Sequence, residues 1–170
     1  MTNSFRLRDA DMTLKLFLST FLFVLTVGYM VGLLFVEHST SLSSQGVQEQ
    51  FLGANESDVS KELKYEKSIN EMYVFIHNHV LSLSLVFLGL GGIFYFSSIV
   101  SDRMKRFLML EPLVAVFTTF GGIALVRFVS PYFSWLVMIS GFSLFISYVL
   151  IVYLIMKELW FSGKGMAAGE

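Results

Sequence analysis

The chain has 170 residues, of which 55% are hydrophobic and only 15% are charged, with a net charge of −1 and no cysteine. Ordinary globular domains carry about 25% charged residues, so this composition indicates an integral membrane protein rather than a soluble domain. The near-zero net charge provides no basic surface for nucleic acid. The lack of cysteine excludes disulfides, thiolate metal sites, iron–sulfur clusters and covalent c-type haem.

Four apolar runs are long enough to cross a bilayer, which takes about 20 residues. We expect spans at about 14–36, 72–98, 107–129 and 133–156. The first run is longer than the apolar core of a signal peptide, so we expect it to be retained. Short turns separate the last three spans, which makes neighbouring helices antiparallel. The sequence therefore predicts an all-α fold, an up-down-up-down bundle of four transmembrane helices in a single membrane domain over 1–170.

The sizeable polar connection is the loop at 37–71 between the first two spans. Its segment Lys61–Lys67 places opposite charges at helical spacing, which predicts a short surface helix. A loop of this length cannot bury much of a core, so we do not expect a separate sensory domain. The tail after Ser162 is rich in small residues, and we expect it to be disordered.

Lysine and arginine are unevenly divided between the two sides that this topology creates. One side collects Arg6, Arg8, Lys15, Arg103, Lys105, Arg106, Lys157 and Lys164, and the other collects Lys61, Lys64, Lys67 and Arg127. Cytoplasmic loops carry the excess of positive charge. We therefore expect a bacterial inner-membrane protein with both termini in the cytoplasm and the 37–71 loop outside.

The segment from Tyr73 to Ser84 places His77, Asn78 and His79 within an otherwise apolar span. Ionisable groups inside a membrane helix are costly, so they indicate a functional site. Successive residues of a helix turn by about 100°, and small residues mark helix contacts in a bilayer. On that basis His77 and Asn78 are predicted to face the bundle, and His79 is predicted to face a flank or the interface.

The other spans add polar groups at the same outer depth. Glu37 and His38 end the first span, while Arg127 and Tyr132 lie between the third and fourth. His77 and His38 beside Arg127 and Tyr132 would suit a b-type haem, with Arg127 as the anion partner.

Three other interpretations of this outer layer stay open. His77, His79 and His38 with Glu37 would suit copper or zinc. His77 and Asn78 would suit a proton or ligand relay. Histidines near an interface also fix helix ends by bonding to loop carbonyls or to Arg127, which requires no ligand at all.

Glu111 precedes Pro112 near the predicted start of the third span. A carboxylate at a helix start interacts favourably with the helix dipole. We therefore expect Glu111 to cap that helix rather than to handle protons.

The run His77-Asn-His79-Val-Leu-Ser82, followed by Gly91-Gly92, Glu111-Pro112 and Ala124-Leu-Val-Arg127, resembles a set of small bacterial four-helix membrane proteins with an H-x-H-x-L-S motif on the second helix. That resemblance covers nearly the whole chain and implies an inner-membrane fold without naming a reaction. In architecture the chain is also similar to the cytochrome b membrane-anchor subunits of respiratory enzymes. Span four has no histidine, so a two-haem arrangement is not expected.

The leading functional hypothesis is a small subunit of a respiratory or electron-transfer complex. It would bind haem b or quinol through His77, His79, His38, Asn78 and Arg127. The alternative is a non-redox accessory subunit that docks other membrane or periplasmic subunits, or binds a small ligand, through its outer polar layer. No constellation of nucleophile and base, phosphate loop or paired carboxylates is present, so an enzyme acting alone is not expected.

Overall fold

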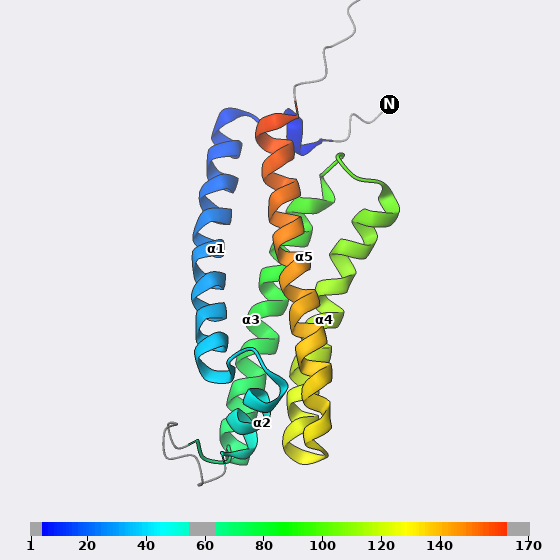
Figure 1. Cartoon of the computed structure of the whole chain (residues 1–170). Coiled ribbons are helices and arrows are strands. Elements are labelled where there is room, and N and C mark those ends of the chain that lie inside the picture. The colour runs from blue at the N-terminus through cyan, green and yellow to red at the C-terminus, as the bar shows by residue number, and fades with distance from the viewer. Residues whose placement is uncertain (1–4, 55–63, 163–170) are drawn as a thin grey trace, which may run out of the picture.

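The computed structural model describes residues 5–54 and 64–162, and all regular structure in these ranges is helical (Figure 1). The four long helices are α1 (Met12–Thr40), α3 (Ile69–Tyr95), α4 (Asp102–Phe128) and α5 (Ser134–Phe161). A short helix, α2 (Ser44–Leu52), follows α1, and two 3₁₀ turns are η1 (Leu7–Asp9) and η2 (Pro131–Phe133). Each long helix is sufficiently long and apolar to cross a membrane. The predicted all-α, four-helix up-down-up-down fold is confirmed.

Helices α1, α3 and α4 begin earlier than their predicted apolar runs because polar side chains cap them. Asp11 accepts a hydrogen bond from the backbone N–H of Leu14 at 2.7 Å, at the start of α1. Ser101 caps α4. The charged residues that follow Ser101 therefore form the first turns of this helix and do not form a separate loop. The predicted start of this helix at 107 is therefore wrong by five residues, since an N-cap serine fixes the start regardless of hydropathy.

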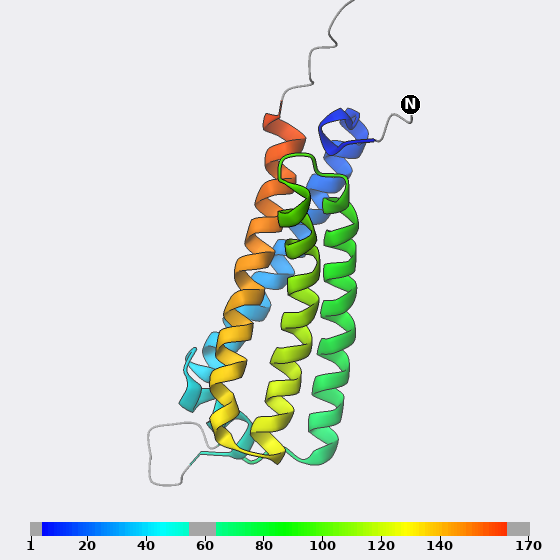
Figure 2. The same cartoon turned by 90° about the vertical axis from the view of Figure 1, so that its right-hand side faces the viewer.

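Helices α3, α4 and α5 form the packed core, while α1 lies against α5 and α2 (Figures 1 and 2). On α1 only Leu18, Leu22 and Thr40 are buried. Helix α1 is joined to α5 by a 2.9 Å hydrogen bond between the hydroxyls of Thr26 and Tyr148 and by stacking of the Tyr29 ring on Tyr148. Nearer the η1 side, the Trp160 ring N–H donates to the Ser19 hydroxyl at 2.9 Å, and Lys15 lies over the Trp160 ring. Much of α1 is therefore free to face lipid or another protein.

The two ends of the bundle differ, and we name them after their short elements. At the η1 end, the N–H of Leu7 donates to the carbonyl of Phe96 at 3.1 Å, and α5 finishes beside η1 (Figure 2). At the α2 end, α2 packs on α4 and α5, and its Val47 and Phe51 are buried. Ser44 and Gln48 of α2 are hydrogen-bonded to the Ser134 hydroxyl at the start of α5. The first and last described residues thus lie at the same end.

The loop between α1 and α3 contains a helix at a different place from the predicted one. Lys64–Lys67 is not helical, and 55–63, with the rest of the predicted surface helix, lies outside the described residues, as does the tail after Ser162. Helix α2 forms instead, because Ser43 caps it by accepting from the N–H of Gly46 at 2.9 Å. Its apolar residues cover one end of the bundle.

Candidate functional site

His79 faces the interior of the bundle rather than a flank. Its ring packs against Phe75 and Phe120, with centroid distances of 4.2 and 5.2 Å, and these two rings also contact each other at 5.9 Å. Its Nδ1–H donates to the carbonyl of Phe75 at 2.8 Å. In a neutral imidazole this leaves the lone pair on Nε2 as the acceptor. His79 is therefore a half-buried ring with one fixed tautomer in an aromatic slot.

His77 and Asn78 are exposed on the outward face of α3, so their predicted inward orientation is wrong. The buried residues of this helix lie on the side opposite Asn78: Met72, Phe87, Leu90, Gly91 and Phe94. The error arises from the small residues, because Ser82, Gly89 and Gly92 also lie on the outward face. Bulky apolar side chains fill the contact with α4 instead.

Arg127 is tied to the loop that precedes α3. Its Nε–H donates to the carbonyl of Lys67 at 2.8 Å, and its guanidinium forms an ion pair with Glu66 at 2.5 Å. The arginine side chain is mostly buried in this contact. Glu37, considered above as a metal ligand, is exposed at the end of α1. The predicted anion partner thus already has a carboxylate and a carbonyl as partners within the chain.

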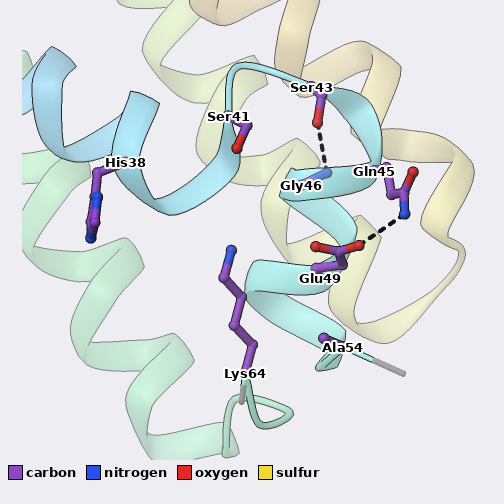
Figure 3. A pocket seen from close by; sticks show the side chains of 8 residues that line it. All are labelled: His38, Ser41, Ser43, Gln45, Gly46, Glu49, Ala54 and Lys64. Carbon is purple, nitrogen blue, oxygen red and sulfur yellow. Dashed lines mark hydrogen bonds between the residues drawn. The ribbon is translucent and has the colours of Figure 1, made fainter. Parts of the chain in front are cut away.

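His38 belongs to a different environment, a polar recess of about 400 Å³ at the α2 end (Figure 3). Figure 3 shows that the recess lies between the last turn of α1 and α2, with Lys64 reaching towards α1. The Lys64 ammonium donates to the carbonyl of Ser39. The lining residues are His38, Ser41, Ser43, Gln45, Gly46, Glu49, Ala54 and Lys64. Neither His77 nor His79 lines this recess.

The three histidines are therefore not gathered into one site. His77 and His79 diverge on one helix, and His38 is exposed at the end of another. Among the described residues no group of three or more histidine, aspartate or glutamate side chains is placed to hold a metal ion. Only His79 has the usual arrangement of a ligand, with one ring nitrogen held by a carbonyl.

Glu111 lies inside α4 rather than at its start, so its predicted role as a helix cap is wrong. It lies nine residues after the first residue of α4, so it does not cap that helix. Instead its two carboxylate oxygens accept hydrogen bonds from Ser143 and Ser147, one turn apart on α5. Helix α5 carries Ser140, Ser143 and Ser147 about one turn apart, and this repeat of hydroxyls was the available sequence signal for such a partner.

Glu158 is a second carboxylate that the sequence did not single out. It is only 1% exposed, near the end of α5. It accepts from the Ser98 N–H at 2.8 and 2.9 Å, from the Ser98 hydroxyl at 2.7 Å and from the Ser97 hydroxyl. These bonds fasten the turn between α3 and α4 to α5, which is a structural role.

Comparison with known proteins places the chain in a family. The Aq_1264_TM family, described as a transmembrane helical domain, matches residues 41–166. The chain belongs to this family. With four long apolar helices, it is a multi-pass integral membrane protein. No curated protein and no solved structure matches the chain.

The family match covers most of the polar groups described above. It spans α2 to α5 and so includes His79, Asn78, Arg127, Glu111 and the two serines that bond to Glu111. Helix α1 and His38 precede it. The helices that form the packed core are thus also the helices that carry the family match.

Proposed function

We propose that the protein is an accessory subunit of a larger membrane assembly and docks to its partner through the outward face of α3. The observation that carries this proposal is the exposed Asn78 amide on that face. Within the described residues its side chain makes no hydrogen bond. In hydrocarbon an amide that lacks a partner is costly, whereas amides across a helix contact hold membrane helices together.

The depth of Asn78 supports the proposal. Its neighbour His79 packs on Phe120 of α4, seven residues before Arg127. At about 1.5 Å per residue, Asn78 lies about 10 Å from the level of Arg127. A hydrocarbon core is about 30 Å thick, so with Arg127 near one edge the amide lies inside it.

The remainder of this face suits a helix of another subunit. Gly89 and Gly92 lie further along the same outward face, and a Cβ built on either meets no atom within 4 Å. Small residues let a neighbouring backbone approach closely. The partner we propose is therefore a transmembrane helix that offers polar groups near Asn78 and packs over the glycines.

The positive charges support an orientation for this subunit. The η1 end carries Arg6, Arg8, Lys15, Arg103, Lys105, Arg106 and Lys157, and the α2 end carries Lys64, Lys67 and Arg127. By the positive-inside rule the η1 end lies in the cytoplasm of a bacterial inner membrane. The docking amide then lies in the outer leaflet.

Photocrosslinking in native membranes tests the docking proposal. A benzophenone amino acid at Asn78 or Gly89 is expected to yield one discrete adduct with a membrane protein other than this chain, whereas adducts only with a second copy of the chain would contradict the proposal. The matched control is Phe117 of α4, which is 76% exposed and should label lipid alone. Discrete adducts from neither α3 position, or the same products from all three positions, would refute the proposal.

Electron transfer is a second proposal, and the geometry of His79 favours it. The Phe75 carbonyl fixes Nδ1–H and leaves Nε2 available to a haem iron or a quinol hydroxyl. His77 lies on the opposite side of α3 from His79, and His38 is exposed at the end of α1, so neither forms an axial pair with His79 within the chain. The spectrum of the purified protein before and after dithionite reduction tests this role. A Soret band that shifts on reduction and disappears in His79→Ala but persists in His77→Ala supports it, and a colourless, quinol-free sample refutes it.

A further inference from the structure

A carboxyl group inside the membrane is the strongest feature that docking does not use. Glu111 lies five residues from Arg106 and sixteen from Arg127 on α4, which is about 8 Å and about 24 Å along the helix axis. Both arginines belong near the edges of a hydrocarbon core about 30 Å thick. The carboxyl is therefore within the hydrocarbon region, where ionisable residues indicate ion or proton pathways.

The charge of Glu111 has no cationic partner among the described residues. The ion pairs found there join Lys67 to Glu71 and Arg127 to Glu66, and neither involves Glu111. Its neighbours on α5 are the hydroxyls of Ser143 and Ser147, which are neutral. A single ionised carboxylate inside the hydrocarbon region is unfavourable unless one positive charge neutralises it.

The titratable groups on the surrounding elements bond elsewhere. Tyr148 of α5 is hydrogen-bonded to α1, and Tyr29 of α1 stacks on it. His79 of α3 donates to its own helix. On α4 itself, Lys105 donates to the carbonyl of Tyr95 at 3.2 Å. None of these groups competes for the Glu111 oxygens.

We propose that Glu111, Ser143 and Ser147 form an intramembrane binding site for one monovalent cation, either a proton or Na⁺. The shared chemistry is a set of hard oxygen atoms with one negative charge, which a monovalent ion neutralises and a divalent ion overcompensates. When a proton binds, an O–H bond of a hydronium ion breaks to leave water, an O–H bond forms on one carboxylate oxygen, and the site charge changes from −1 to 0.

The two serines suit either occupied state. A hydroxyl can both donate and accept, so each serine donates to the carboxylate or accepts from the carboxylic acid by rotation alone. Their oxygens can also join the carboxylate around Na⁺. Both occupancy changes thus leave the α4–α5 contact in place. Glu111 is half-buried, so a reagent dissolved in the membrane can reach it.

The test is modification of the full chain in liposomes by dicyclohexylcarbodiimide, a membrane-soluble reagent that attacks the protonated carboxyl. Peptide mapping by mass spectrometry locates the adduct, with exposed Glu71 as an internal reference and Glu111→Gln as the variant that should lose it. Rates are compared across pH in choline buffer, and then at fixed pH with added NaCl or KCl.

A proton site predicts an adduct at Glu111 whose rate falls as pH rises and which NaCl does not affect. A sodium site predicts that NaCl, but not KCl, slows the reaction several-fold at fixed pH. No adduct at Glu111 at any pH, or an adduct rate that neither pH nor Na⁺ changes, would overturn the proposal and leave the carboxyl as a helix tie.

The serines provide a second measurement with a matched control. At fixed pH in choline buffer, Ser147→Ala should react about tenfold faster, because the ionised carboxylate loses a charge-assisted hydrogen bond worth at least that factor. Thr118→Ala is the control, since this hydroxyl donates to the carbonyl of Val114 in its own helix α4. Equal rates for Ser147→Ala and wild type would contradict the assigned role of the serine.

Discussion

Removal of the Glu158 carboxylate should detach the turn between α3 and α4 from α5. Three donors converge on it, the Ser97 hydroxyl and the N–H and hydroxyl of Ser98. Hydrogen bonds to a charged group contribute about 1.5–3 kcal/mol each. The exposed Ser98 can bond partly to water once the carboxylate is removed, so the loss corresponds to about two such bonds. We expect Glu158→Ala to lower the free energy of unfolding by about 3–5 kcal/mol.

The assay is equilibrium unfolding in mixed micelles, followed by tryptophan fluorescence during a titration with denaturing detergent. Glu158→Gln should lose only about 1–2 kcal/mol, because its amide oxygen still accepts. Lys157→Ala is the neighbouring control and gives up an exposed contact with the Tyr153 ring, worth about 0.5–1 kcal/mol. A loss for Glu158→Ala no larger than that of Lys157→Ala would refute the clamp.

Three further substitutions test the fold at separate places. Gly46→Ala should destabilise by more than about 3 kcal/mol in the same titration, since its Cβ would lie 1.8 Å from the Thr40 carbonyl oxygen, whereas Gly28→Ala, with nothing within 4 Å, should cost nothing. Arg127→Ala should increase hydrogen exchange at the loop before α3 about tenfold, because it loses a charge-assisted hydrogen bond, and an unchanged exchange rate would contradict this. Ser68→Ala removes the capping box of α3 and should cost about 1 kcal/mol; a loss below 0.3 kcal/mol would show that the cap is not needed.

The four spans could be predicted because the bilayer imposes a minimum apolar length on every crossing helix. The start of α4 could not be predicted in this way, because Asp102 and the basic residues after it are polar yet helical. The N-cap at Ser101, not hydropathy, determines where that helix begins. The same limitation hid α2, whose apolar residues are too few to form a conspicuous run.

The orientation of α3 required information that one helix does not contain. In water, the hydrophobic effect separates inward from outward residues, but lipid solvates leucine and phenylalanine as well as a core does. Phe87 is buried and Leu88 exposed, although both are apolar. The small residues Gly89 and Gly92 lie on the outward surface of α3. The orientation of His77 was therefore predicted wrongly, because these glycines were assumed to mark the inward face.

The Glu111 site was missed for a related reason. Its serine partners are 32 and 36 residues away on another helix. A carboxylate beside a proline near a predicted helix start is also typical of a cap. Only the rotation and register of α4 against α5 distinguish the two roles, and neither is present in a hydropathy pattern.

The loose attachment of α1 has a consequence for biogenesis. The Thr26 and Tyr148 hydroxyls that join α1 to α5 are 122 residues apart, so α1 leaves the ribosome long before its partner is made. Helix α1 must therefore insert into the membrane before α5 is synthesised. Its surface is apolar and few of its residues are buried against the bundle, so it is stable in lipid without a partner helix. The association of α1 with the bundle is therefore completed only when the C-terminal helix α5 has inserted. A chain truncated before α5 should retain α1 as an independent helix in the bilayer.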